Sequence, residues 1–238
     1  MDIESPATET PRAARGADLR RLLLDTALRI VQAEGTDQVS VREVARRAGV
    51  SSGAPFRHFR DRNALLAALA EEGHEALAAE VRARVAEQPD DPVARLRAVG
   101  LSVVRIAARH PAHFRVMHLD LPLSPRAEAL VGEKRVFMRA LITDGQARGL
   151  IRPGDPDDVA LACVAMVTGL ARLYTDGLTG VPLNDALRDP ARIDAVVERA
   201  INLFGAGLAT EAYWSAIGCA PGTEVPLWTP FQTAGAPR

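Results

Sequence analysis

The chain has 238 residues, of which 47% are hydrophobic and only 4% aromatic, and its formal net charge is −1. That length allows one large domain or two small ones, with a core built mainly from Ala, Leu and Val. The near-neutral total excludes a chain that is basic throughout, but the charge is uneven. Residues 11–62 carry eleven arginines against six acidic residues, whereas residues 1–10 carry three acidic residues and no basic one. Positive charge is therefore concentrated near the N-terminus.

Cysteine usage and hydropathy indicate the compartment. The two cysteines, Cys163 and Cys219, are too few for a disulfide framework, and Cys163 is expected to be a buried thiol. Residues 1–10 are acidic and polar, unlike a signal peptide. The longest apolar run, 159–171, is too short to span a bilayer and suits a core helix. We therefore expect a soluble, cytoplasmic protein.

The first residues contain two prolines, a glycine and scattered charge, which predicts a disordered N-terminal arm over 1–16. From Asp18, apolar residues recur at steps of three and four. This spacing indicates a helix that ends at Gly35.

A second, short helix is expected to follow, with Ser40 as its N-cap. Glu43 stands three residues later, which is the spacing of a capping box, and Gly49 is placed to close the helix. Ser51 is expected to cap a third helix over 52–59, in which Gly53 and Pro55 fall in the tolerant first turns.

The rest of the chain has a helical pattern with proline- and glycine-rich breaks. A long helix is predicted from about Asp61, as N-cap, to Gln88. Further helices are predicted over 93–109, 111–120, 125–148, 156–176 and 189–205. No strand-like alternation or repeat is present, so the sequence predicts an all-α fold of about nine helices, with a small N-terminal unit before a larger bundle.

Three short helices in about 45 residues, the last two joined by a tight turn with a glycine, form a helix-turn-helix arrangement. Residues 24–69, LDTALRIVQAEGTDQVSVREVARRAGVSSGAPFRHFRDRNALLAAL, resemble the DNA-binding domain of TetR-type transcriptional regulators. The similarity covers the first helix ending in Glu-Gly, the VxxVAxxAGVS pair, the F-x-H-F close of the third helix and x-R-x-x-LL.

The resemblance implies a domain organisation. We expect a helix-turn-helix DNA-binding domain over 17–63, a helical ligand-binding and dimerisation domain over 64–218, and an irregular tail over 219–238. Segments 109–122 and 165–180 are similar to a C-terminal subtype of the family, although that subtype's Trp and His-Gly signature is absent.

The resemblance also implies which residues face DNA. Arg57 could make two hydrogen bonds to a guanine, worth ~1–3 kcal/mol of discrimination, and Arg62 is placed to hold a phosphate. Phe56 stands where the family usually has Tyr, so a phosphate-seeking hydroxyl is absent. The full expected set is Ser40, Arg42, Ser52, Gly53, Ala54, Phe56, Arg57, His58 and Arg62.

Simpler explanations exist for parts of this set. The third helix could be a surface helix with an incidental Arg and His, and capping alone explains Ser40. Solvated charge explains Arg12, Arg15, Arg20 and Arg21 as well as contact with the DNA backbone does.

The larger side chains of the middle helices indicate an apolar small-molecule effector, although plain core packing explains them too. They are His113, Phe114, Met117, His118, Phe137, Leu141, Met166, Leu170 and Tyr174. The histidines and Cys163 lack the spacing of metal ligands, so neither a metal nor another cofactor is expected. The helices 156–176 and 189–207 carry apolar faces, which either pair with a second copy of the chain or fill an intrachain core.

The expected function is therefore a ligand-responsive, sequence-specific transcriptional regulator. In this hypothesis it is a repressor that binds a palindromic operator as a homodimer and is released by a small apolar molecule. One alternative is an all-α enzyme with an incidental helix-turn-helix, although the chain lacks a nucleophile elbow, a phosphate loop and HExxH. The other is a DNA-binding regulator without an effector.

Overall fold

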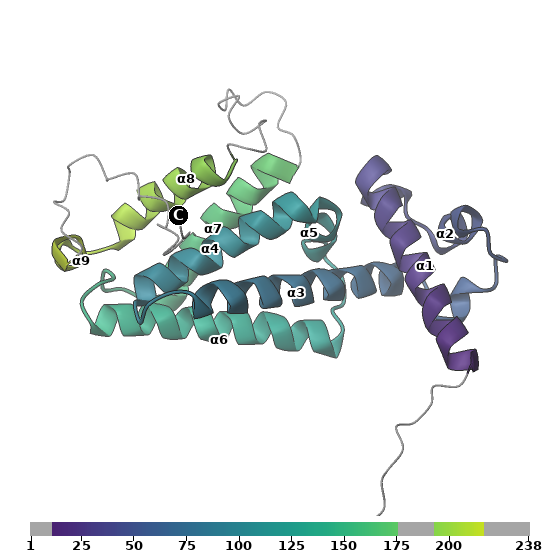
Figure 1. Ribbon diagram of the computed structural model, residues 1–238, viewed down its shortest axis with the longest axis horizontal. Coiled ribbons are helices and arrows are strands. Elements are labelled where there is room, and N and C mark those ends of the chain that lie inside the picture. The colour runs from purple at the N-terminus through teal and green to yellow at the C-terminus, as the bar shows by residue number, and fades with distance from the viewer. Residues whose placement is uncertain (1–10, 176–192, 217–238) are drawn as a thin grey trace, which may run out of the picture. The chain divides into compact units, whose positions relative to one another are not determined.

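The computed structural model describes residues 11–175 and 193–216, and within these ranges the chain is helical (Figure 1). Nine α-helices, two 3₁₀ turns and one isolated β-bridge, Ile151 with Ala209, make up its regular structure. The predicted all-α fold is confirmed. In chain order the elements are α1 Pro11–Glu34, η1 Thr36–Gln38, α2 Val41–Ala48, η2 Pro55–Arg57, α3 Arg62–Ala86, α4 Pro92–Arg109, α5 Pro111–Met117, α6 Pro125–Ala147, α7 Pro156–Thr175, α8 Ile193–Leu208 and α9 Glu211–Ala216.

Several helix ends lie where capping residues predict them. Asp61 accepts a hydrogen bond from the Ala64 amide at 2.8 Å through its Oδ1, so α3 begins one residue later, as expected. Asp91 caps α4 in the same way, through the amides of Val93 and Ala94. Gly149, with φ of 69°, follows the end of α6.

Other boundaries differ from the sequence-based prediction. The helix α1 begins at Pro11, so residues 11–16 are helical rather than part of a disordered arm. The rest of the predicted arm lies outside the described residues, as do the first residues predicted for the last long helix and the tail 219–238. The short helix α9 had not been predicted. The largest difference, at residues 52–59, concerns the functional site.

The chain divides into two compact units. The first contains Met1–Gly73 and Pro111–Ala127, and the second contains His74–His110 and Glu128–Arg238. The helix α3 thus contributes to both, and α5 packs on α1 in the first. This division places the short α5 segment with the N-terminal helices rather than with the rest of the chain.

The first unit has an aliphatic core. Leu23 and Leu24 of α1 pack with Leu65 and Leu66 of α3, all at most 1% exposed, and Phe59 joins them at 3% exposed. The expected core role of Phe59 is confirmed. Burying such side chains contributes roughly 1.5–3 kcal/mol each.

In the second unit, α4 packs closely against α7 and α8, which lie beside it in Figure 1. Close approach is possible because α4 has a glycine there: a Cβ on Gly100 would lie 3.3 Å from Val167 and 3.5 Å from Ile201. The buried side of α7 also contains Cys163 and Ala171.

The helix α7 is 20 residues long and is, in the described part of the chain, the one helix whose length and composition would let it cross a membrane. The apolar run 159–171, which was predicted to be too short to span a bilayer, is only a part of this helix. Length and composition are weak evidence, because a core helix of a soluble protein meets the same criteria. The side of α7 away from α4 exposes Leu161 and Val164.

Candidate DNA-binding interface

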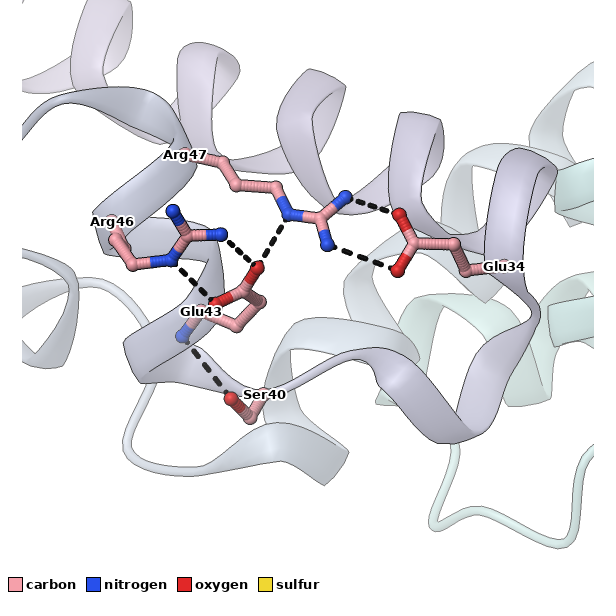
Figure 2. Close-up of polar contacts among 5 residues, drawn as sticks. All are labelled: Glu34, Ser40, Glu43, Arg46 and Arg47. Atoms are coloured by element: carbon pink, nitrogen blue, oxygen red, sulfur yellow. Dashed lines mark hydrogen bonds and ion pairs between the residues drawn. The ribbon is translucent and has the colours of Figure 1, made fainter.

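The helix α2 is capped at both ends. The Ser40 Oγ accepts a hydrogen bond from the Glu43 amide at 3.1 Å, which confirms the predicted N-cap (Figure 2). Gly49 has φ of 69°, and its N–H turns back to the carbonyl oxygens of Ala45 and Arg46. Only a glycine adopts this conformation without a steric cost, so the turn after α2 depends on Gly49.

The Glu43 side chain joins an ion-pair cluster instead of completing the capping box (Figure 2). It accepts hydrogen bonds from Arg46 at 2.6 and 2.8 Å and from the Arg47 Nε at 2.5 Å. Arg47 then reaches Glu34, at the end of α1, with two nitrogens, one of them at 2.9 Å. The cluster thereby links α1 to α2.

These arginines shift the acid–base equilibria of their partners. Hydrogen bonds from Arg46 and then Arg47 lower the pKa of Glu43 to about 2, and Arg47 lowers the pKa of Glu34. The ionised carboxylates compensate the two arginine charges. Arg46 and Arg47 are accordingly structural, and their spacing from Glu43 of three and four residues could have indicated this from the sequence.

The charges that remain uncompensated belong to other arginines. Arg42 and Arg57 are exposed, and neither pairs with a carboxylate in the described part of the chain. Arg42 lies in the first turn of α2, and Arg57 lies in η2, which packs beside α2. The unpaired positive charge at this end of the helix-turn-helix is thus carried by two of the residues expected to face DNA.

The segment expected to be a recognition α-helix is a 3₁₀ turn, η2, of only three residues. Pro55 has no N–H and cannot donate the first α-helical bond to the Ser51 carbonyl oxygen. The amide of Ala54 donates to that oxygen instead, at 3.0 Å, and the His58 amide donates to the Pro55 carbonyl oxygen at 2.9 Å. Ala54, rather than Ser51, takes the N-cap position of this turn, with no side-chain cap bond. The prediction of a helix over 52–59 capped by Ser51 is therefore wrong.

The shorter segment changes which side chains are available. Ser52, Gly53 and Arg57 are exposed, Phe56 keeps 48% of its surface exposed, and His58 is partly buried beside the Phe59 ring. Ala54 was expected to face DNA, but this prediction is wrong, because the turn leaves it only 7% exposed.

Arg62 has partners other than the expected phosphate. Its Nε donates to the Val39 carbonyl oxygen at 3.0 Å and its Nη2 to the Thr36 carbonyl oxygen at 2.9 Å. These oxygens belong to the link between α1 and α2. Arg62 therefore links the start of α3 to the segment before Ser40, and the structure supports this structural role for Arg62.

The arginines of α1 also have local partners. The Arg20 guanidinium lies 5.7 Å from the centre of the Phe59 ring. Arg21 bonds Asp25 at 2.5 Å and Glu72 of α3 at 2.7 Å. Contacts of these two with the DNA backbone remain predictions, and the side chains of Arg12 and Arg15 lie outside those described.

The residues expected to bind an effector fall in both units. His113, Phe114, Met117 and His118 belong to the first, where Phe114 is core at 2% exposed and the His118 Nδ1 lies 2.8 Å from its carbonyl oxygen. Leu141 is buried in the second unit, where the remaining members are partly buried: Phe137, Met166, Leu170 and Tyr174.

His113 and Cys163, both outside the helix-turn-helix, have structural surroundings rather than metal-binding ones. The His113 Nε2 lies 3.4 Å from Glu72, and burial raises the pKa of the Cys163 thiol to about 11. The expected burial of Cys163 is confirmed. Over the described residues, no three His, Cys, Asp or Glu side chains cluster as metal ligands do.

The all-α fold and the exposed arginines of α2 and η2 are those of a helix-turn-helix protein. Comparison with known proteins supports the same class. The family described as bacterial regulatory proteins, tetR family, matches residues 23–69, and the tetracyclin repressor-like C-terminal domain matches residues 89–177. The HTH-type transcriptional repressor Rv1474c of Mycobacterium tuberculosis is 47% identical over 60 residues, which are 25% of this chain and 32% of that protein.

Two solved structures extend the similarity over most of the chain. A protein with unknown function from Rhodococcus sp. RHA1 is 33% identical, with a TM-score of 0.63, over 87% of this chain and all of that one. AibR, solved in complex with isovaleryl coenzyme A and operator DNA, shares the fold at 21% identity and a TM-score of 0.60, over 79% of this chain and 97% of that one.

The chain belongs to the TetR family of bacterial transcriptional regulators, which are soluble DNA-binding proteins and not enzymes. The similarity to the curated relative named above spans about a third of that relative's length.

Proposed function

We propose that this protein is a homodimeric, cytoplasmic repressor that binds a palindromic operator and releases it when a small molecule binds the second unit. The observation that carries the proposal is the arrangement of charge around α2. Arg46 and Arg47 are neutralised by Glu43 and Glu34, whereas Arg42 and Arg57 are exposed and unpaired in the described structure. Such cations contact phosphates and guanine edges.

The DNA-reading surface that we propose consists of Arg42, Ser52, Gly53, Phe56 and Arg57, with partly buried His58 at its edge. Gly53 and Phe56 offer no side-chain hydrogen bonds to bases, because Gly53 has no side chain and Phe56 is apolar. Recognition would therefore depend on Arg57, Arg42 and the deformability of the DNA.

Dimerisation would use the exposed apolar side chains of α7 and α8. Leu161 and Leu203 are 67% and 70% exposed, and Val164 is 42% exposed. Large apolar residues on two neighbouring helices support pairing with a second copy of the chain. In such a dimer the two DNA-reading surfaces would meet half-sites about 34 Å apart.

The sign of regulation and the response to a ligand are supported by the relatives. Rv1474c is named a repressor, and AibR was solved with both a small molecule and operator DNA. A ligand of this protein would have to bind the DNA-free conformation more tightly than the DNA-bound one in order to release the operator.

The test is selection of genomic fragments by the purified protein, followed by titration of the enriched site by fluorescence anisotropy. We expect a palindromic site, bound more tightly than a shuffled duplex. Replacing Arg57 with Ala should weaken specific binding about 5- to 150-fold, the equivalent of ~1–3 kcal/mol for a lost guanine contact.

The matched control is Arg82→Ala, which removes the same charge. Arg82 is exposed on the part of α3 that belongs to the second unit. This variant should bind the site like the wild type. Failure to enrich any site, or equal binding by the Arg57 and Arg82 variants, would contradict the proposal.

A further inference from the structure

A buried row of side chains on α6 contains one charged residue. Leu130 and Met138 are each 5% exposed, and Lys134 stands midway between them, four residues from each. Residues four apart lie on the same face of an α-helix. Lys134 therefore belongs to the inward row of α6, and it is itself partly buried.

The Lys134 ammonium has no carboxylate partner and no hydrogen bond in the described part of the chain. Burial without such a partner lowers its pKa. Partial burial of an unpaired charge is unfavourable, because fewer water molecules solvate it.

Arg97, in the same unit, gives a contrast. Its side chain is 9% exposed, and it lies 3.7 Å from the Glu198 carboxylate. The folded chain thus supplies a counter-charge for the buried Arg97 and none for Lys134 among the described residues. Lys134 is also the chain's only lysine, in a sequence that otherwise uses arginine for this charge.

The surroundings of Lys134 on α6 are apolar. Phe137 follows three residues later and Leu141 seven residues later, so both lie on or beside the same face. A row that offers one ammonium among Leu, Phe and Met side chains is suited to a molecule with an apolar body and one negative charge.

We propose that Lys134 is the anion-binding group of the effector site and that the effector is an apolar carboxylate. The inference rests on the proposed function, which needs an effector, and it adds a negative charge to the apolar effector expected from the sequence. The effector carboxylate pairs with the Lys134 ammonium and supplies the missing counter-charge. Its apolar body lies along the row of α6.

The experiment measures thermal stabilisation and dissociation constants for matched pairs of compounds. Each pair is a carboxylic acid and its methyl ester, with straight-chain bodies of six to sixteen carbons and with phenyl and bicyclic bodies. The proteins are the full chain and three variants: Lys134→Met, Lys134→Arg, and Arg135→Met as the control, since Arg135 is exposed on the same helix.

We expect at least one acid to stabilise the wild type while its ester does not. Lys134→Met should bind that acid at least tenfold more weakly, whereas Lys134→Arg and Arg135→Met should bind it within about threefold of the wild type. Without ligand, Lys134→Met should be at least as stable as the wild type, because methionine keeps the chain length and removes the unpaired charge.

Three results would overturn the inference: stabilisation by no acid, equal stabilisation by acids and esters, or unchanged affinity of Lys134→Met for the acid. Operator titration separates this failure from failure of the proposed function. If the wild type binds its selected DNA but acids do not act through Lys134, only the inference fails. If the wild type selects no DNA, the proposed function fails, whatever the acids do.

Discussion

The helix α2 and the segment Ser51–Phe59 follow each other in sequence but are built differently. The helix is capped by Ser40 and Gly49 and linked to α1 by four charged side chains. The segment after it has no side-chain cap and only a three-residue 3₁₀ turn. One part of the helix-turn-helix is thus fixed by many polar contacts, while the other is held mainly by burial of Ala54, Pro55 and Phe59.

The difference separates two requirements of a DNA-binding motif. The caps and ion pairs of α2 set the position of the motif, and the proposed contacts with DNA come from Arg42 and from the exposed side chains after α2. Substitutions of the capping residues of α2 and of Arg62 should therefore act on stability, whereas substitutions of the exposed side chains in Ser51–Phe59 should act mainly on DNA binding.

The strongest effect on stability is expected from Arg62→Met. The variant loses two hydrogen bonds to the carbonyl oxygens of Thr36 and Val39, which should lower the free energy of unfolding by about 2 kcal/mol. Urea unfolding measures this, with Arg60→Met as control, because Arg60 is 83% exposed. Unchanged stability combined with weaker binding to every DNA sequence would instead support the phosphate contact expected from the sequence.

The next effect is expected from Gly49→Ala. An added Cβ meets no atom within 4 Å, so any cost comes from the backbone φ of 69°. Placing alanine in this left-handed region costs about 1–2 kcal/mol. Urea unfolding should show this loss, and unchanged stability would mean that the turn adopts another conformation without cost.

Ser40→Ala should remove the N-cap of α2 and cost about 1 kcal/mol of stability. Ser52→Ala serves as the control, because Ser52 is exposed in the segment Ser51–Phe59 and caps no helix. Equal stability of the two variants would show that the ion pairs of Glu43 hold α2 in place without the cap.

The smallest effect, and one of opposite sign, is expected from Gly53→Ala. This glycine also has open space around it, but its φ is not positive. Alanine there should raise the free energy of unfolding by about 0.5 kcal/mol, since it restricts the unfolded chain. Operator affinity should fall, because a methyl group would separate the segment from the DNA. Loss of stability would show that the segment needs the freedom of glycine.

Much of this fold could be predicted from local sequence. The helix caps depend on neighbours within four residues, as at Asp61, Ser40 and Gly49. Such capping residues can be recognised from the sequence without knowledge of the tertiary structure. The 3₁₀ turn could not be anticipated with the same certainty, because Gly53 and Pro55 are tolerated in the first turns of an α-helix as well.

Long-range partners account for the remaining differences at the site. The carbonyl oxygens that hold Arg62 lie 23 and 26 residues earlier in the chain, and Glu34 is 13 residues from Arg47. No spacing rule predicts such pairs. The resemblance assigned DNA-facing positions by register alone, and register does not reveal that Ala54 is buried or that Arg62 is engaged by the backbone.

The restriction to a single lysine has a chemical consequence for regulation. Lysine acylation is a common way to remove positive charge from a DNA-binding protein. Here the cations proposed to meet DNA are all arginines, and the one ε-amino group of the 238 residues lies on the inward row of α6. Acetylation of lysine would therefore leave the charge of the DNA-reading surface unchanged. It would instead remove the positive charge of Lys134 at the proposed effector site.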